Sequence, residues 1–114
     1  MRYIDQYGNV FTDMRFVRSR YVDNGRPYVE AWCKEEGNDY YEPYAGVTVN
    51  IFAPLTAIDG YHVHADTNNV PRLVDWMCEQ GLMTKTGKVA RSGWCEYPEV
   101  ELNHEWYDGL ESYE

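Results

Sequence analysis

Cysteines, long apolar runs and basic residues are all scarce in this 114-residue sequence. The three cysteines, Cys33, Cys78 and Cys95, are odd in number and widely spaced, which excludes a disulfide framework and a paired CxxC motif. No stretch approaches the roughly 18 apolar residues of a membrane helix, and the N-terminus lacks the apolar core of a signal peptide. We therefore expect a soluble protein with reduced thiols in the cytoplasm of a host cell, with no membrane partner.

Lys and Arg together number 10, against 19 Asp and Glu, which gives a net charge of −9 at pH 7. A protein that binds nucleic acid directly needs the opposite sign because it must neutralise phosphates, so we expect no direct nucleic-acid partner. The 44% hydrophobic content predicts a folded chain, and the length fits one domain. Within this single domain, residues 1–114, we expect a core over about residues 10–103 and a loose acidic extension over 104–114.

Turn-forming residues divide the chain into β-like runs. The pair Asn24-Gly25 is typical of a tight turn and predicts that residues 22–26 close a hairpin. Residues 84–88 are polar and contain a glycine, so we expect a surface loop there. The predicted strands are 10–21, 28–34, 44–52, 61–65 and 97–103.

One helix is predicted over about residues 69–80. Leu73, Trp76 and Met77 have helical spacing, Pro71 suits a first turn, and Gly81 stands where a helix commonly ends. The polar side chains of residues 67–69 are expected to cap its start. Together these elements predict an α+β fold, a largely antiparallel β-sheet of about five strands with one packed α-helix.

No motif predicts catalysis. His62, His64 and Asp66 would share one face of a strand at a spacing that metal ligands use, but an exposed strand face that ends in a turn explains the same pattern. Cys95 has no assigned base and lacks the glycine-x-serine-x-glycine elbow, so we interpret it as a structural residue. We therefore expect no enzyme activity, no metal and no cofactor.

The C-terminal twenty residues are the most unusual part of the chain, with seven carboxylates and no Lys or Arg. Over residues 97–103 we expect Val100 and Leu102 to face the core and Glu99 and Glu101 to face outward. Carboxylates two apart on a strand are spaced by about 6.5–7 Å, which is comparable with phosphates along a nucleic-acid strand. The seven carboxylates are Glu96, Glu99, Glu101, Glu105, Asp108, Glu111 and Glu114.

Four short segments carry a resemblance to a known family: Thr48-Val49-Asn50, Asp66-Thr67-Asn68-Asn69, Gly81-Leu82 and Ser92-Gly93-Trp94-Cys95-Glu96-Tyr97-Pro98. In order and spacing they resemble domain of unknown function 4313, a family of small proteins encoded by phages and mobile elements of gut bacteria. The resemblance covers about residues 44–103 and implies no known activity. It does favour a mobile-element origin, where small acidic proteins often block host defence enzymes.

We therefore expect an acidic inhibitor that occupies the basic nucleic-acid-binding surface of a host defence protein, such as a CRISPR effector or a restriction enzyme. One alternative is an accessory or self-assembling structural protein, for example a homodimer formed through the tyrosine-rich sheet. The other is a small metal-dependent enzyme at His62, His64 and Asp66. The expected partner-binding residues are Glu96, Glu99, Glu101, Glu105, Asp108, Tyr97, Trp106 and Tyr107.

Overall fold

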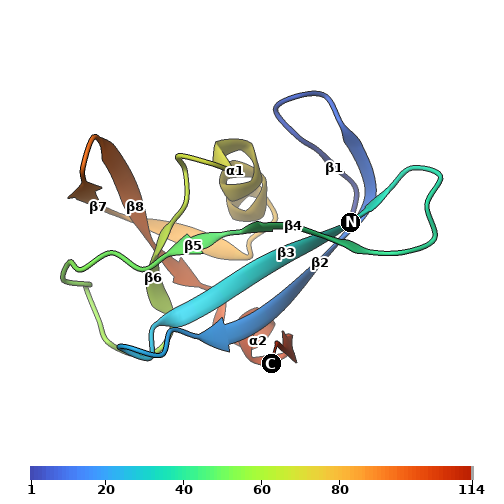
Figure 1. Ribbon diagram of the computed structural model, residues 1–114. Helices are drawn as coiled ribbons and strands as arrows, with labels where there is room; N and C mark the ends of the chain where they lie inside the picture. Colours follow the sequence, from blue (N-terminus) through green and yellow to red (C-terminus); the bar gives the residue numbers. More distant parts are fainter. Residues whose placement is uncertain (114) are drawn as a thin grey trace.

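A computed structural model of the protein describes residues 1–113. This part of the chain forms nine strands and two helices, arranged as two sheets around one hydrophobic core (Figure 1). The first sheet has the order β1 (Tyr3–Ile4), β2 (Val10–Arg20), β3 (Pro27–Glu35) and β4 (Glu42–Gly46), with β9 (Glu111–Ser112) beside β2. The second has the order β5 (Thr48–Val49), β6 (His62–Ala65), β8 (Cys95–Leu102) and β7 (Met83–Ser92).

The predicted α+β fold with a single sheet of about five strands is wrong. The chain is mostly antiparallel β-structure in two sheets, and its helices are short: α1 (Pro71–Glu79) and α2 (His104–Asp108). Among the strand pairs of residues 1–113, the β2–β9 pair alone is parallel. The number of strands predicted from the sequence was too low. The two sheets were not distinguished, because they share one core and local sequence patterns do not show which strands pair.

The predicted β2–β3 hairpin is confirmed. Its connection includes residues 21–26, where the Tyr21 N–H donates to the Arg26 carbonyl at 2.9 Å and the backbone of Gly25 has a φ of 73°. A positive φ is inexpensive only for glycine, which explains the Asn24-Gly25 pair.

The predicted strand over residues 44–52 is divided between the two sheets. β4 pairs with β3 in the first sheet, whereas β5 pairs with β6 in the second. Val47 lies between them and is fully buried. Its N–H donates to the Val29 carbonyl at 2.9 Å, and its carbonyl accepts from the Asp66 N–H at 2.8 Å. One extended segment therefore serves both sheets.

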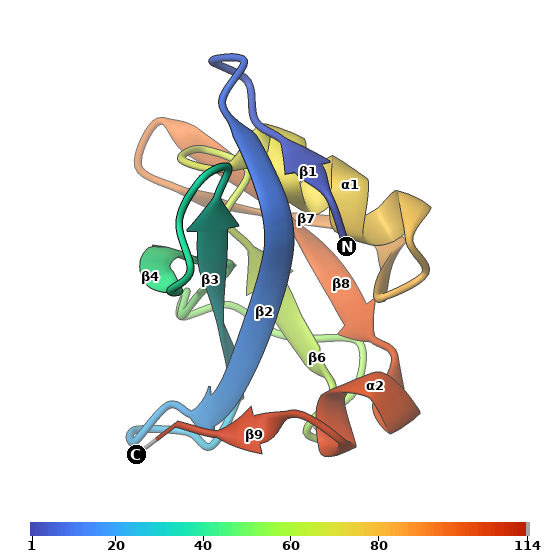
Figure 2. The same cartoon turned by 90° about the vertical axis from the view of Figure 1, so that its right-hand side faces the viewer.

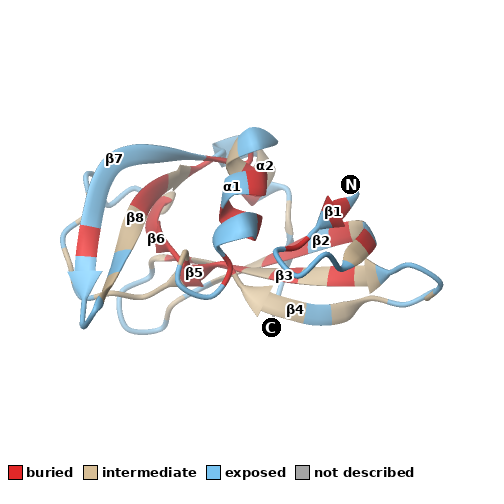
Figure 3. Ribbon diagram, turned by 90° about the horizontal axis from the view of Figure 1, so that it is seen from above, coloured by how far each residue is buried: buried red, intermediate tan, exposed pale blue. Residues whose placement is uncertain are grey.

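Residues 84–88, predicted as a loop, belong to β7. This strand forms the outer edge of the second sheet, and nearly all of its residues are exposed (Figure 3). Its register with β8 shifts between Lys85 and Val89. An edge strand that is exposed to solvent on both faces needs no alternation of apolar and polar residues. The usual strand pattern is therefore missing from the sequence of β7.

Helix α1 confirms the predicted helix with slightly shorter bounds. Pro71 occupies the first turn, and Gly81 has a φ of 76° just beyond the end. The Leu82 N–H donates to the Met77 carbonyl and the Gly81 N–H to the Cys78 carbonyl, which is the Schellman arrangement of a helix end. The predicted capping differs, because no side chain caps the first turn.

The buried face of α1 contacts the first sheet through aromatic rings. The Trp76 ring centroid lies 5.3 Å from that of Tyr3 and 6.4 Å from that of Phe16. Leu73 and Met77 are fully buried beside it. No helix in residues 1–113 is long and apolar enough to cross a membrane.

Residues 104–113 pack against the core, whereas the sequence suggested a loose extension. Asn103 caps α2 by accepting from the Trp106 N–H at 2.9 Å. Tyr107 is fully buried, and its hydroxyl donates to the Ser19 carbonyl at 2.7 Å. Figure 2 shows α2 and β9 lying across one end of β2 and β6. Glu114 lies outside the described residues.

Removing the Tyr107 side chain should destabilise the whole protein. Tyr107→Ala should lower the free energy of unfolding by about 3–5 kcal/mol, because a fully buried aromatic ring is replaced by a cavity. Urea denaturation followed by circular dichroism measures this. Tyr113→Ala is the control, since Tyr113 is 46% exposed and its removal should cost less than about 0.5 kcal/mol. Equal effects of the two changes would contradict the packing of α2.

Candidate functional site

The predicted outward face of β8 is covered over part of its length. Val100 and Leu102 face the core and are fully buried, as predicted. The opposite face was expected to carry exposed carboxylates, but Glu99 is only 1% exposed. The pairing of β8 with β6 and β7 does not explain the burial of the Glu99 side chain. Residues 50–61, which join β5 to β6, contribute Thr56, which bonds the Glu99 side chain.

The buried Glu99 carboxylate has three donors. The Thr56 N–H donates to Oε1 at 2.8 Å, while the Thr56 and Thr86 hydroxyls donate to Oε2 at 2.5 and 2.8 Å. Burial alone would raise the pKa of Glu99, but these hydrogen bonds outweigh it and hold the pKa below its usual range. Glu99 therefore stays charged and joins the 50–61 segment to β7 and β8, and in this conformation it is not available to a partner.

His64 lies opposite Glu99 on β6 and is also buried, at 2% exposure. Burial and the nearby Arg26 charge lower the pKa of His64, although Glu99 acts in the opposite direction. The His64 ring is therefore neutral at pH 7. Its Nδ1 atom has no hydrogen-bond partner among residues 1–113.

The structure does not bring His62, His64 and Asp66 together as one set of metal ligands. Asp66 accepts hydrogen bonds from the backbone and side chain of Asn69, at 3.1 and 2.9 Å, and so forms the turn before α1. His62 instead contacts Asp59, with 2.9 Å between Nδ1 and Oδ1. The three side chains thus have separate environments.

Of the three aromatic residues expected to contact a partner, the two on α2, Trp106 and Tyr107, differ in accessibility. Tyr107 is fully buried and serves the core. Trp106 is half-buried, and its ring lies edge-on against Phe16 with 5.6 Å between the centroids. Of the pair, only Trp106 still presents surface to solvent.

Asp59 and Glu101 lie together beside His104, and α2, which carries His104, also carries two more carboxylates. We call these four carboxylates the acidic corner: Asp59, Glu101, Glu105 and Asp108. The Glu101 carboxylate lies 2.8 Å from His104 Nε2, and the Tyr61 hydroxyl donates to Asp108 at 2.8 Å. Glu105 and Asp108 are exposed on α2. Glu96 and Tyr97 lie elsewhere, near the β7–β8 turn, where Glu96 is in register with Arg91.

Sequence reasoning missed Asp59. The segment that carries it was expected to be a plain loop, but Gly60 has a φ of 84° and turns the chain back toward β6. The Asp59 carboxylate then accepts from the Tyr61 N–H at 2.9 Å as well as contacting His62. The available signal was the Asp-Gly pair directly before a strand.

Basic side chains near these residues mostly contact main-chain carbonyls. Arg26 donates to the carbonyls of Ile51 and Ala53 at 2.8 and 2.7 Å, and Arg20 donates to that of Gly60 at 2.7 Å. Both arginines therefore hold the 50–61 segment in place without pairing with a carboxylate.

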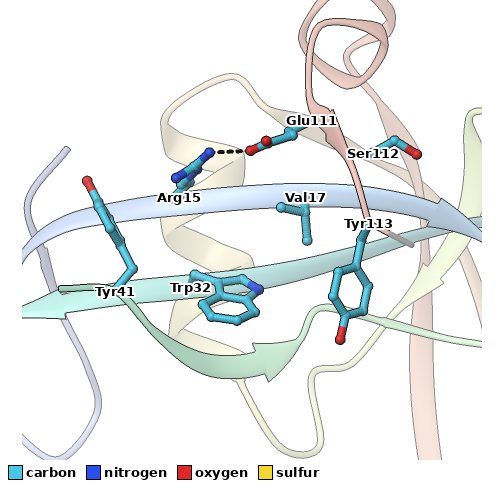
Figure 4. A pocket seen from close by; sticks show the side chains of 7 residues that line it. All are labelled: Arg15, Val17, Trp32, Tyr41, Glu111, Ser112 and Tyr113. Carbon is cyan, nitrogen blue, oxygen red and sulfur yellow. Dashed lines mark hydrogen bonds and ion pairs between the residues drawn. The ribbon is translucent and has the colours of Figure 1, made fainter.

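A pocket of about 430 Å³ lies on the other side of the molecule, on the outer face of the first sheet (Figure 4). Arg15 pairs with Glu111 at its rim, and its guanidinium carbon lies 5.8 Å from the centre of the Tyr41 ring. Trp32 Nε1 is buried without a hydrogen-bond partner among residues 1–113. The lining residues are Arg15, Val17, Trp32, Tyr41, Glu111, Ser112 and Tyr113.

A family model described as a domain of unknown function (DUF4313) matches residues 17–113. The chain belongs to this family. The match extends beyond the segments that carried the resemblance, since it includes the end of β2, all of β3 and α2. No curated protein and no solved structure matches the chain.

Replacing Glu99 should change how stability depends on pH. The folded-state pKa of Glu99 lies below its ordinary value of 4.5, so its contribution is complete above that value and disappears as the pH falls toward the folded-state pKa. Glu99→Gln should be less stable than the wild type by about 1–3 kcal/mol at pH 7, because three donors lose a charged acceptor. The difference should shrink between about pH 5 and pH 3.

Thermal unfolding over this pH range measures the effect, and Glu96→Gln is the matched control because Glu96 is exposed on the same strand. A difference between Glu99→Gln and wild type that stays constant with pH would show that the charge is not responsible.

His64 should make the protein less stable in mild acid. Its folded-state pKa lies below the ordinary 6.5, so the unfolded chain takes up a proton first and stability falls as the pH drops below that value. His64→Leu should flatten the stability profile between about pH 7 and pH 5. Chemical denaturation at several pH values tests this, with His104→Leu as the control at an exposed histidine. An unchanged slope in His64→Leu would contradict the neutral buried state.

Proposed function

We propose that the protein is a non-catalytic binding protein of a phage or mobile element. It inhibits a host defence protein that handles nucleic acid, such as a CRISPR effector or a restriction enzyme, by occupying a basic surface in the host cytoplasm. The observation that carries the proposal is the acidic corner, where three of the predicted partner-binding residues (Glu101, Glu105 and Asp108) meet Asp59.

The charge of the corner is largely available to a partner. Glu105 and Asp108 project from exposed positions of α2, and the Glu101 side chain is 43% exposed. The contacts of Glu101 and Asp108 with His104 and Tyr61 leave further lone pairs on both carboxylates. Grouped carboxylates of this kind attract the Lys and Arg side chains that a nucleic-acid groove uses for phosphates.

The corner is also held in a defined shape. α2 is fixed to the core by buried Tyr107, and the neighbouring Trp106 packs on Phe16 while keeping part of its ring exposed. A preformed surface loses little conformational entropy on binding, and an aromatic residue beside charges is typical of interface hot spots.

Glu96 and Tyr97 form a second contact in the proposal. Four residues lie between Glu96 and Glu101, so the two are about 17 Å apart along β8. Side chains alternate along a strand, so Tyr97 shares the face of Glu101 and Glu96 lies on the opposite face near the turn. A basic groove would contact the acidic corner at one end and Tyr97 at the other, with Glu96 at its edge. Glu99 lies between them in sequence but is buried, so it takes no part.

Charge reversal at the corner should abolish inhibition while the protein remains folded. Glu105→Lys with Asp108→Lys replaces two exposed carboxylates, so binding to a basic surface should weaken by more than about tenfold, and the weakening should be largest at low salt. The measurement is DNA cleavage by a panel of purified CRISPR nucleases and restriction enzymes, with and without the protein.

The matched control reverses two exposed carboxylates away from the corner, Glu36→Lys with Glu79→Lys, which alters the net charge by the same amount. If both double variants inhibit equally, the corner is not the contact surface. If the wild type inhibits no member of the panel and light scattering gives a stable homodimer, the alternative of a self-assembling structural protein is favoured.

A further inference from the structure

The acidic corner contains a convergence of metal-ligating groups. Asp59, Glu101 and His104 each place one ligand atom so that the three lie within 4.8 Å of one another. They come from three separate parts of the chain: the segment before β6, strand β8 and helix α2. The group is not merely acidic, because an imidazole nitrogen is among its three donors.

The His62 side chain lies beside two of these groups, Asp59 and Glu101. Its side chain is 8% exposed, its Nδ1 lies 2.9 Å from Asp59 Oδ1, and its Nε2 lies 3.9 Å from Glu101 Oε1. The 2.9 Å contact holds the Asp59 carboxylate in place, as second-layer groups do around protein metal sites, and the other nitrogen of the ring faces Glu101.

Tyr61 positions the third group. Its ring stacks on His104 with 3.8 Å between the centroids and an angle of 13° between the planes. Its N–H also donates to Asp59 Oδ1 at 2.9 Å, and its hydroxyl donates to Asp108 at 2.8 Å. His104 Nε2 then points to Glu101 Oε2, 2.8 Å away. Asp59 and His104 are therefore fixed by side-chain contacts outside the set, and Glu101 is placed by the backbone pairing of β8 with β6.

The electrostatics of the cluster favour a cation. Asp59 and Glu101 lie together in a chain whose net charge is −9. Two further carboxylates, Glu105 and Asp108, are on α2, the helix that also carries His104.

We propose that Asp59, Glu101 and His104 bind a divalent transition-metal ion, Zn²⁺ or Mn²⁺, with His62 as a positioning residue. Two carboxylates and one imidazole suit these ions, whereas Mg²⁺ and Ca²⁺ prefer oxygen donors alone. Bonds of about 2.0–2.2 Å bring donor atoms to within about 4.4 Å of one another, so the set must contract slightly. The side chains of Asp59 and His104 are 36% and 50% exposed, which leaves them room to do so.

The bound ion would add a further link between segments that the pairing of β6 with β8 and the Thr56–Glu99 hydrogen bonds already bring together. It would connect the 50–61 segment to β8 and α2, and with three protein ligands on a partly exposed site it would keep positions open to water or to a partner's side chain. This inference goes beyond the proposed function, since inhibition through the carboxylates requires no metal.

Metal titration of untagged, chelator-treated protein tests the site. Calorimetry with Zn²⁺ and with Mn²⁺ should show one ion per chain, and saturation should raise the melting temperature. His104→Ala and Glu101→Gln should each weaken binding at least about tenfold, and His62→Gln should weaken it by about 10–100-fold through loss of positioning. Mg²⁺ and Ca²⁺ should bind much more weakly than either transition metal.

Glu79→Gln is the matched control, because it removes one exposed charge on α1, outside the acidic corner, and its affinity for Mn²⁺ should equal that of the wild type. The Mn²⁺ arm separates this site from zinc held by Cys78 or Cys95, since thiolates favour Zn²⁺ over Mn²⁺. Absence of binding to both ions overturns the proposal, as does Mn²⁺ binding that His104→Ala and Glu101→Gln leave unchanged. Neither result affects the cleavage assays, which are run with metal-free protein and with protein loaded with the ion.

Discussion

The two backbone hydrogen bonds of Val47 hold the architecture together. Its N–H belongs to the first sheet through Val29 and its carbonyl to the second through Asp66. Because the residue is fully buried, leaving either group unpaired would be costly. The passage of the chain from the first sheet to the second at Val47 therefore sets the position of β5 relative to β4, and with it the position of β6 and β8. The placement of His62, His64 and Glu99, which lie on β6 and β8, follows from this single residue.

A polar layer lies on the face of the second sheet that points away from the core. Glu99 and His64 are as deeply buried there as many core residues, and Thr56 of the 50–61 segment bonds the Glu99 carboxylate. Segments of this kind usually have few fixed contacts and high mobility. Here the threonine bonds to Glu99 and the arginine bonds to backbone carbonyls restrain the segment. Asp59 is held at the acidic corner as a result.

Local patterns predicted the local structures well. The β2–β3 hairpin follows from Asn24-Gly25, and α1 follows from Pro71, its apolar spacing and Gly81. Non-local features were harder. The alternation along β8 correctly separated Val100 from Glu99, but alternation identifies two faces without showing whether a distant segment covers one of them.

The candidate site shows the same limit. Glu101 and His104 are close in sequence, but Asp59 and His62 join them only because β6 pairs with β8. In the same way, the sequence shows Tyr107 only as one more aromatic residue in an acidic tail. Its hydroxyl donates to the Ser19 carbonyl, which lies far away in the chain, so local sequence does not predict this contact. Residue composition indicated a negatively charged surface, and the tertiary pairing decides which charges share a location.

The arginine contacts with carbonyls affect the field around the whole molecule. Arg18, Arg20, Arg26 and Arg72 donate to main-chain oxygens, and within residues 1–113 only two Lys or Arg side chains, Arg15 and Lys85, pair with carboxylates. Most acidic side chains are consequently left without a neutralising neighbour. A positively charged macromolecule would be drawn in from beyond contact distance, so its association rate, more than its dissociation rate, should depend on ionic strength. The bonds that hold a surface segment in place thus also determine how fast the protein can find a partner.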